Sequence, residues 1–414
     1  MDLEAWESCL RRIVLKAGAG VLEELLHDVG CGRRAESVSC ECGRAMQSVG
    51  LRNKTIQTIL GPIRFRRSLY VCPSCGKGCF PGDLILGVQN TGYSPGLRRL
   101  MARAGSRTSF ADAEDDLREY AGLDIGRKEI QRIAEEVGKE VDAWTKNDLY
   151  ESGPETDPLF PILYISFDGT GIPIQRRELK GRKGKQSDGT AKTREVKLGC
   201  LFTQTTTDAD GCPVRDPEAT TYTGAIETSQ EFGWRIYREA RLRGLFHARQ
   251  AVVLTDGAKY NKTIVETHFP QAVHIIDLYH ARENLIDMAK LLLKDPERES
   301  LQKEWLDQLD RGAIEELLAA VQHHLPAKGK RRRAGLNALR YFQENAQSMR
   351  YEHFRKQGFF VGSGVVEAGC RTLIGQRLKM SGMFWSVAGA NAIIASRCSQ
   401  FSHRFELFWA SRAP

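Results

Sequence analysis

The sequence predicts a mixed α/β fold in which a sheet-forming core is interrupted by a long helical segment. Between residues 156 and 280, short apolar runs with strand character alternate with helical patterns. Residues 281–360 contain only helical patterns, and residues 361–414 form the second part of the core with short C-terminal helices. A helix, a cysteine-rich β segment and further helices precede the core. We therefore expect about two to four domains in this chain.

The first 90 residues predict a helix followed by a small β module. Residues 1–35 form the helical part, with one apolar stripe at helical spacing: Trp6, Leu10, Ile13, Val14, Val21 and Leu25. In the β module, residues 36–90, strands are predicted over 54–60 and 63–71. Gly61 and Pro62 are predicted to form the turn between them.

Cysteines are concentrated in this β module. Six of the eleven cysteines in the chain fall between residues 31 and 79, and clustered thiols in a reducing compartment indicate a metal site rather than disulfides. Four thiolates around the predicted hairpin, from Cys40, Cys42, Cys72 and Cys75, are the usual ligands of a structural Zn²⁺ in a zinc ribbon. Cys-x-Cys is a tight spacing, so Cys31 or Cys79 is a possible substitute ligand. Reduced, buried thiols are the other interpretation.

Residues 91–155 predict a helical region. Helical stretches over 110–120 and 125–137 are separated by a short turn that contains Gly122, which is the pattern of a helix-turn-helix. Any antiparallel pair of helices gives the same pattern. A helix that reads DNA and a plain helix pair are therefore both compatible with this region.

The core of residues 156–280 places acidic residues directly after predicted strands. Strands are predicted over residues 163–167, 196–203, 251–255 and 272–276, and a helix over 229–242. Asp168, Asp256 and Asp277 follow three of these strands. Ligands gather at strand ends in such sheets, so these acids are candidate site residues. The alternative for Asp168 and Asp256, each followed by glycine, is a simple turn.

The second half of the chain supplies a third acid. Residues 362–364 break the helical pattern and open a helix that carries Glu367, and residues 388–408 predict one or two apolar helices. Glu367 follows Asp256 by 111 residues, which is too long for a single helix and its loop. Residues 281–360 therefore have the character of an all-α insertion.

Positive charge is concentrated in two blocks of a chain whose formal net charge is +8. Residues 31–108 hold 13 Lys and Arg against three Asp and Glu, and residues 328–379 hold 12 against three. Two separated basic regions suit a long polyanion such as DNA, although solvated helix faces would explain either block alone. No stretch approaches the roughly 20 apolar residues of a membrane span, and the N-terminus lacks a secretory pattern. We expect a cytoplasmic protein without a membrane partner.

Three carboxylates from separate elements suit metal-dependent chemistry on phosphodiesters. Two Mg²⁺ ions about 3.5–4 Å apart can clamp the attacking and leaving oxygens, and such hard ions prefer carboxylate ligands. Carboxylates that are close together repel each other unless a cation neutralises them. Asp168, Asp256 and Glu367 are therefore the candidate ligands of a divalent ion.

Five stretches around these acids carry motifs. They are residues 166–173 (SFDGTGIP), 191–200 (AKTREVKLGC), 255–258 (TDGA), 276–282 (IDLYHAR) and 360–370 (FVGSGVVEAGC). In this order they resemble the blocks of ISKra-type insertion-sequence transposases, which are relatives of the Mutator-like group. The resemblance extends from about residue 36 to the C-terminus.

The resemblance implies an RNase H-like catalytic core, split by the all-α insertion, and a DDE mechanism that depends on Mg²⁺ or Mn²⁺. Asp168 and Asp256 would bind metal directly, and Glu367 would complete the site. Asp277 and His280 match the Asp-x-x-His motif of Mutator-like enzymes. His280 would then contact the scissile phosphate and Asp277 would orient it. The alternative is that Asp277 only caps the next helix, with His280 packed beside it.

Basic residues outside the acidic motifs are expected to contact DNA phosphates. They are Arg64, Arg66 and Arg67 on the predicted hairpin, Arg98, Arg99 and Arg103 on the following helix, and Lys183 and Lys185 in a basic loop. The basic loop would grip DNA near the cut, or it is only the tip of a hairpin. Phosphate contacts carry no sequence information, so recognition of transposon ends is expected from residues 110–137.

The predicted function is that of a DNA transposase that cuts the ends of an insertion sequence and joins them to target DNA. Its partners would be transposon-end and target double-stranded DNA, and it would act as a homo-oligomer on paired ends at the bacterial nucleoid. One alternative is a domesticated transposase that binds specific DNA without cutting it. A second is a metal-dependent nuclease without strand transfer. The presence of all three acids disfavours the first, and the resemblance disfavours the second.

Overall fold

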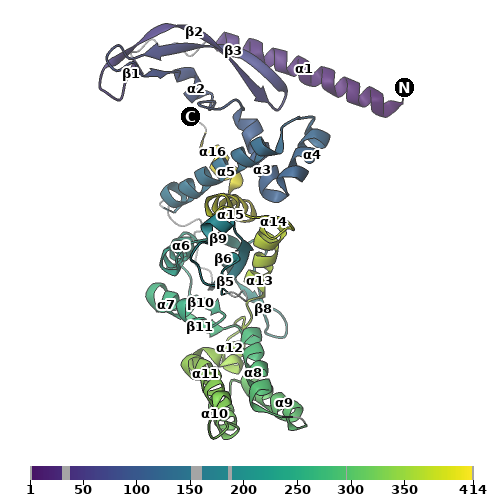
Figure 1. Cartoon of the computed structure of the whole chain (residues 1–414), viewed down its shortest axis with the longest axis vertical. Helices are drawn as coiled ribbons and strands as arrows, with labels where there is room; N and C mark the ends of the chain where they lie inside the picture. The colour runs from purple at the N-terminus through teal and green to yellow at the C-terminus, as the bar shows by residue number, and fades with distance from the viewer. Residues whose placement is uncertain (1, 30–37, 151–160, 185–188, 295, 413–414) are drawn as a thin grey trace. The chain divides into compact units, whose positions relative to one another are not determined.

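The computed structural model describes residues 2–29, 38–150, 161–184, 189–294 and 296–412. Helices and sheets are mixed along the chain, which confirms the predicted α/β class (Figure 1). The chain forms two compact units, Met1–Val137 with Leu407–Pro414, and Gly138–Glu406. Lys185 and Cys31, which the sequence analysis singled out, lie outside the described residues. Within the described ranges, no helix is both long enough and apolar enough to cross a membrane.

The first unit begins with helix α1 (Leu3–Val29) and a four-stranded antiparallel sheet. The strands are β1 (Val38–Ser39), β2 (Ala45–Thr58), β3 (Gly61–Val71) and β4 (Gly78–Cys79). The turn between β2 and β3 consists of Ile59 and Leu60 rather than the expected Gly61 and Pro62. Gly61 already pairs with Thr58 and has a φ of +123°, which a residue with a side chain rarely adopts.

The apolar stripe predicted for the first helix does not form the core of this unit. α1 packs on β3 through Ala19, Leu22 and Leu26, which lie against buried Ile63 and Phe65. The stripe that the sequence analysis identified, from Trp6 to Leu25, is exposed instead. The helix has a second apolar side, and that side is the one buried inside the unit.

Four helices follow the sheet: α2 (Pro81–Ile85), α3 (Pro95–Arg107), α4 (Phe110–Ala121) and α5 (Arg127–Trp144). Side chains of Ser94 and Ser109 cap α3 and α4 by accepting backbone N–H groups. Gly122 ends α4 in the left-handed conformation. The expected helix pair around Gly122 is thus present, but α5 begins two residues later than expected and continues seven residues further, to Trp144. The boundary between the two units falls within α5.

The second unit is built on a five-stranded sheet with the order β11-β10-β5-β6-β9. The strands are β5 (Ile162–Pro173), β6 (Thr193–Gln204), β9 (Thr221–Ala225), β10 (Gln250–Thr255) and β11 (Val273–Ile276). β5, β6 and β9 are antiparallel neighbours, whereas β10 runs parallel to both β5 and β11. A small hairpin, β7 (Thr206–Thr207) and β8 (Pro213–Val214), follows β6.

Alternate residues of these strands serve two separate hydrophobic clusters. Leu163, Ile165 and Phe167 of β5 lie in one cluster with residues of α6 (Ser229–Leu242) and α7 (Lys259–His268). Tyr164, between them, belongs to the other cluster. Successive side chains of a strand point to opposite faces, so the sheet has a helical layer on each face. Burying both faces explains the nearly continuous apolar runs in residues 162–167 of β5 and 251–254 of β10.

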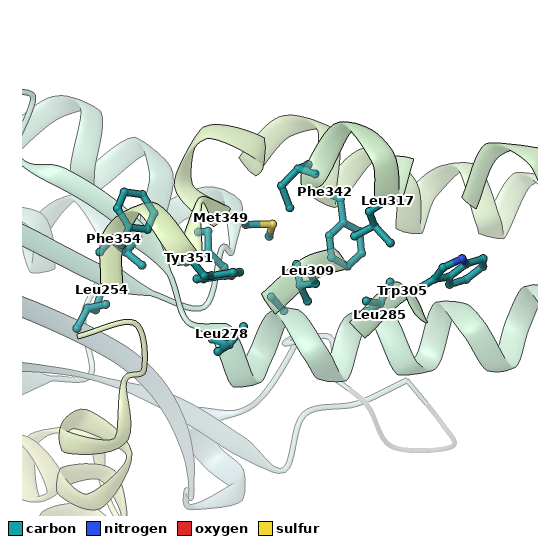
Figure 2. Close-up of a cluster of buried hydrophobic side chains, with 14 of the residues drawn as sticks. Leu254, Leu278, Leu285, Trp305, Leu309, Leu317, Phe342, Met349, Tyr351 and Phe354 are labelled. Carbon is teal, nitrogen blue, oxygen red and sulfur yellow. The ribbon is translucent and has the colours of Figure 1, made fainter. Parts of the chain in front are cut away.

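The all-helical segment shares a hydrophobic cluster with the second face of the sheet. Its helices are α8 (Leu278–Leu292), α9 (Glu297–Asp310), α10 (Ile314–His323), α11 (Lys330–Asn345) and α12 (Tyr351–Lys356). Trp305, Leu309 and Phe342 of these helices share one buried cluster with Leu254 of β10 (Figure 2). The segment and the sheet are therefore joined by a continuous apolar core.

The C-terminal part returns to the sheet. It contains α13 (Gly364–Gly369), a π-helical turn over Cys370–Gly375, α14 (Gln376–Leu378), α15 (Val387–Phe401) and α16 (Phe405–Ala410). α13 packs on β5 and β6, and α15 packs on β9. At Gly369 an added Cβ would lie 2.8 Å from the Tyr222 ring, so glycine permits the close approach of α13 to the sheet.

A buried ion pair fastens the C-terminal segment to α6. Arg404 Nη1 lies 2.9 Å from both carboxylate oxygens of Glu239, and both side chains are almost fully buried. Thr221 Oγ1 donates a further hydrogen bond of 2.8 Å to Glu239. Removing one partner from such a pair leaves an uncompensated charge in the interior.

We therefore expect Arg404→Met to lower the free energy of unfolding by about 3–5 kcal/mol, because Glu239 would be buried without its counter-charge. Urea denaturation monitored by circular dichroism measures this change. The double variant Glu239→Leu/Arg404→Met should recover much of the loss. A single variant with wild-type stability would show that the pair contributes nothing.

Candidate metal centres

Asp168 and Asp256 lie at the same edge of the second unit's sheet. Asp168 was expected at the end of a strand, but β5 continues to Pro173 because residues 168–173 pair with β6. The parallel pairing of β5 with β10 does stop at Ser166, so Asp168 lies where that part of the sheet ends. Asp168 has the same strand parity as Tyr164, and Asp256 continues the parity of Leu254. Both acids thus belong to the face that carries α13.

The carboxylate of Asp256 is held in one orientation by its own turn. Its Oδ1 accepts hydrogen bonds from Ala258 N at 2.9 Å and from Asn261 Nδ2 at 2.7 Å. Tyr341 of α11 donates to the backbone oxygen of Asp256 at 3.1 Å. Gly257 has a φ of +81°, so the Asp-Gly turn predicted as the alternative is present. The turn and a metal site are compatible, because the turn fixes the direction of the side chain.

Glu367, His280 and Asp277 are close together although they come from different parts of the chain. His280 Nε2 lies 3.8 Å from Glu367 Oε1, and Ser363 Oγ donates to the same oxygen at 3.1 Å. Asp277 is fully buried, and its Oδ1 accepts from His280 N at 2.7 Å. Its Oδ2 accepts from Ser363 N. Asp277 therefore caps α8 and ties it to the segment before α13.

The surroundings of Asp168 raise the pKa of its carboxyl. Burial raises the pKa of the Asp168 carboxyl, the Gly169 N–H lowers it, and the negative charges of Asp256 and Glu367 raise it further. The neighbouring His280 side chain acts in the opposite direction and lowers the pKa of Asp168. The net pKa lies above the ordinary value for an aspartate. A divalent cation between these groups would favour the ionised form.

The carboxylates of Asp168, Asp256 and Glu367 are not close enough together to bind one shared ion. Among the described residues, Asp277, His280 and Glu367 have ligand atoms that all lie within 4.8 Å of one another, whereas Asp168, Asp256 and Glu367 do not form such a group. A site for two ions spans a greater distance, because the ions themselves are about 3.5–4 Å apart. Both carboxylate oxygens of Asp277 already accept backbone N–H groups, so this residue is better placed to position its neighbours than to bind an ion.

Several side chains beside the acids were not identified from the sequence. The Cys370 thiol lies 3.9 Å from Asp168 Oδ2, and burial, followed by the charge of Asp168, raises the pKa of Cys370 to about 12. Lys197 pairs with Glu195 at 3.0 Å on β6. Burial raises the pKa of Tyr260, and the charges of Glu195, Asp256 and Asp168 raise it further. The signal for Glu195 and Lys197 was available, since both lie in the motif of residues 191–200.

The second candidate centre is formed by Cys40, Cys42, Cys72 and Cys75 in the first unit. Their sulfur atoms all lie within 4.8 Å of one another, with 3.5 Å between Cys40 and Cys75 and 3.5 Å between Cys42 and Cys72. Sulfurs placed about 2.3 Å from a tetrahedral Zn²⁺ are roughly 3.8 Å apart, so the spacing fits this ion. It does not fit a disulfide, which requires about 2.05 Å.

Two tight turns bring the four thiols together. Gly43 N donates to Cys40 O, and Gly76 N donates to Cys72 O, with positive φ values at both glycines. The N–H groups of Cys75 and Ser74 point at the Cys72 sulfur and lower the pKa of this thiol to about 6. A thiolate is the form that binds a metal. Cys79 is not part of this group; its thiol contacts Met46 at 3.6 Å.

The basic residues expected to contact DNA are in different environments. Arg64 and Arg66 are exposed on β3, Arg99 is exposed on α3, and Arg103 is half-buried there. Lys183 is exposed and pairs with Thr190 in a single β-bridge. These five residues are compatible with a phosphate contact.

Arg98 and Arg67 are engaged inside the first unit. Arg98 is buried, and its guanidinium bonds to Glu136 at 2.8 Å. Arg67 pairs with the buried Asp83, and its guanidinium lies 3.6 Å above the Phe80 ring. A buried charge needs such a partner. The expectation that Arg98 contacts DNA is therefore wrong. Arg67 mainly stabilises the fold of the first unit.

The fold and the two centres define a mixed α/β protein with a group of acids at one sheet edge and a four-cysteine group that could bind zinc. No protein-family model matches the chain, and no curated protein matches it in sequence. Among solved structures, the chain is similar to a Drosophila P element transposase strand transfer complex. The TM-score is 0.32 at 10% identity, over 77% of this chain and 94% of that one. So distant a likeness assigns neither a fold nor a function.

We expect the purified protein to contain one zinc ion per chain and Cys72→Ser to lose it, because the other three thiols cannot complete a tetrahedron. Elemental analysis measures the zinc content. Cys79→Ser is the matched control and should keep the ion. Loss of zinc from the control would indicate a different ligand set, and a wild-type protein free of zinc would leave only four reduced thiols, of which Cys42 and Cys75 are exposed.

We expect Asp168→Asn to stabilise the metal-free protein at neutral pH. The stability that a carboxyl with a raised pKa contributes is complete below its pKa in the unfolded chain and is lost as the pH rises through its folded-state pKa. Asparagine does not ionise, so the variant keeps this stability as the pH rises. The melting temperature in chelator should therefore rise at pH 7, which differential scanning calorimetry measures.

This gain should disappear at acidic pH and become smaller when Mg²⁺ is added, since the ion stabilises the carboxylate. Asp208→Asn is a suitable control, because Asp208 is exposed and only accepts hydrogen bonds within its turn. A melting temperature lowered at every pH would mean that Asp168 is a turn residue only.

Proposed function

We propose that the chain is a DNA transposase that cuts and joins DNA with divalent metal ions held by Asp168, Asp256 and Glu367. The proposal rests on three acids from separate elements near one edge of the sheet: Asp168 and Asp256 lie where the β5–β10 pairing ends, and Glu367 is on α13, which packs on β5. These three acids come from β5, from the turn after β10 and from α13, and the charges of the other two raise the pKa of Asp168. Acids brought together from three elements at an energetic cost are typical of a functional site.

The proposed fold of the second unit is an RNase H-like core. Its support is the strand arrangement, with three antiparallel strands followed by two parallel strands, and with the first strand, β5, in the centre. The helical segment α8–α12 enters this core between β11 and α13. The proposal thus treats residues 281–360 as an insertion between the second and third acids.

The donor set favours Mg²⁺ or Mn²⁺ for the acidic centre, because hard ions prefer carboxylate oxygens. Bound ions would stabilise the charge on the attacking and leaving oxygens of the DNA backbone. Asp168 is half-buried and Glu367 more exposed, so the acids line an edge that DNA can approach. Asp256 is kept in place by Ala258 N and Asn261.

His280 and Asp277 have different proposed roles. His280 is partly exposed beside Glu367 and would contact the phosphate that is cut. Asp277 is a positioning residue, because it is buried and holds the starts of α8 and of the α13 segment together. The capping role considered for Asp277 is present, and it is what keeps His280 next to Glu367.

The first unit is proposed as a DNA-binding region stabilised by a zinc-ribbon-like centre. Arg64, Arg66, Arg99 and Arg103, with Lys183 in the second unit, are the proposed phosphate contacts. The transposase would act on double-stranded transposon ends and target DNA, as a homo-oligomer, in the bacterial cytoplasm. The sequence resemblance to ISKra-type transposases is what favours strand transfer over simple cleavage.

The test is Asp256→Asn, which keeps the oxygen that accepts from Ala258 and Asn261 but removes the charge. We expect cleavage and strand transfer on DNA that carries the element's ends to fall by about three orders of magnitude or more with Mg²⁺ or Mn²⁺, since the ions lose a ligand. Binding to the same DNA should persist, because a negative charge near phosphate is removed. Gel assays of product and of bound DNA measure both.

Asp208→Asn serves again as the control and should retain activity. Near-normal strand transfer by Asp256→Asn at saturating DNA and metal would contradict the proposed site. Cleavage without any joined product in the wild type would identify a nuclease. DNA binding with no cleavage by the wild type would identify a domesticated transposase.

A further inference from the structure

Helix α1 is apolar on two opposite sides, and only one of them is covered. At 3.6 residues per turn, Ala19, Leu22 and Leu26 lie on the side that packs on β3. The opposite side carries Leu3, Trp6, Leu10, Ile13, Val14, Val21 and Leu25, whose side chains are between 55% and 73% exposed. In Figure 1 the N-terminal part of α1 runs past the end of the β2–β3 hairpin. We call these seven residues the outer stripe.

An apolar stripe of this length on a helix indicates a partner. Single exposed apolar residues are common, but a continuous row of large ones marks an interaction surface. The spacing of Leu3, Trp6, Leu10 and Ile13 is three, four and three residues, as in the seam of paired helices. The partner is therefore expected to present a helix with a similar stripe.

The charges beside the outer stripe identify that helix. α1 begins with acidic Asp2, Glu4 and Glu7, continues with basic Arg11, Arg12 and Lys16, and then has acidic Glu23 and Glu24. In a parallel pair of α1 helices, each acidic stretch would face the acidic stretch of the other helix, and each basic stretch would face the basic one. An antiparallel pair overlapping over the whole helix would also place acidic ends together and basic centres together. Like charges at such positions destabilise a pair.

A shorter antiparallel overlap removes this conflict. We propose that α1 binds α1 of a second copy of this chain in antiparallel orientation, through residues 2–16 of the outer stripe. The two-fold axis then passes near Cys9. Glu7 faces Arg11 of the partner subunit, and Asp2 faces Lys16 of the partner subunit. Symmetry makes each of these pairs occur twice.

The same register matches the apolar residues. Trp6 lies against Leu10 and Ile13 of the partner subunit, and Leu3 lies against Val14 of the partner subunit. The overlap of 15 residues extends over roughly 22 Å. β3 occupies the other side of α1, so the sheet of each copy leaves this side open. The proposal does not depend on the function proposed above, because it rests on α1 alone.

The first test is the association state of the full chain without DNA, measured by sedimentation equilibrium over a range of concentrations. We expect a reversible dimer for the wild type and at least tenfold weaker association for Leu10→Asp. Leu10 is 62% exposed, so the circular dichroism spectrum should not change, whereas the melting temperature should fall to that of the monomer because association no longer stabilises the folded chain. Leu25→Asp is the matched control, since Leu25 belongs to the outer stripe but lies outside the overlap, and it should dimerise normally.

The second test concerns orientation. Glu7→Lys should weaken the dimer, because the new lysine would face Arg11 of the partner subunit. Glu7→Lys/Arg11→Glu should restore association by exchanging the two charges. Arg11 also bonds to the Tyr120 carbonyl, so the melting temperature of the double variant is measured alongside. A parallel pair predicts no weakening by Glu7→Lys.

The third test uses Cys9, which is exposed. A short bis-maleimide should link two wild-type chains through Cys9, and Cys9→Ser should prevent this link. A wild-type protein that stays monomeric at all concentrations overturns the proposal. So does a dimer that Leu10→Asp leaves intact, or one that Leu25→Asp and Leu10→Asp weaken equally.

Discussion

The candidate catalytic centre depends on the contacts of one buried carboxylate, Asp277. One of its oxygens accepts the N–H of His280 and the other accepts the N–H of Ser363, which lies 86 residues further along the chain. Leu278 N adds a hydrogen bond of 2.9 Å to Val361 O beside it. These bonds fix the point where the chain returns from its helical segment to the sheet. Glu367, one turn of helix after Ser363, is brought beside His280 as a result.

Bringing the acids of this centre together lowers the stability of the folded protein, and the hydrophobic cores around the sheet compensate for this loss. Asp168 carries a raised pKa, which means that its charged form is disfavoured in the folded protein. Apolar burial on both faces of the sheet offsets this cost. Leu163 and Ile165 are buried in the cluster on one face, and Tyr164 and Leu254 are buried in the cluster on the other. The positions of the acids thus follow from strands whose register is fixed by their apolar neighbours.

The sequence predicted those parts of the structure that local patterns determine. Helix α6 was predicted with its observed bounds, and β10 and β11 to within one residue, because apolar runs and capping residues are local signals. The partners of charged residues were not predictable. Arg98 pairs with Glu136, 38 residues away, so nothing near Arg98 in the sequence distinguishes it from exposed Arg99. The exposed stripe of α1 was also indistinguishable from a buried one, because the helix is apolar on two sides.

The continuous core between the sheet and the helices α8–α12 has a consequence for synthesis of the protein. All strands of the second unit's sheet end by Ile276, whereas Phe354 of α12 and Val366 of α13, which are buried in one cluster with Tyr164 and Leu254, are made afterwards. While the ribosome completes those helices, Tyr164, Val252 and Leu254 present an apolar face to the cell. Nascent chains in this state are prone to aggregate. The order of elements therefore gives the chain an interval in which chaperones have a surface to bind.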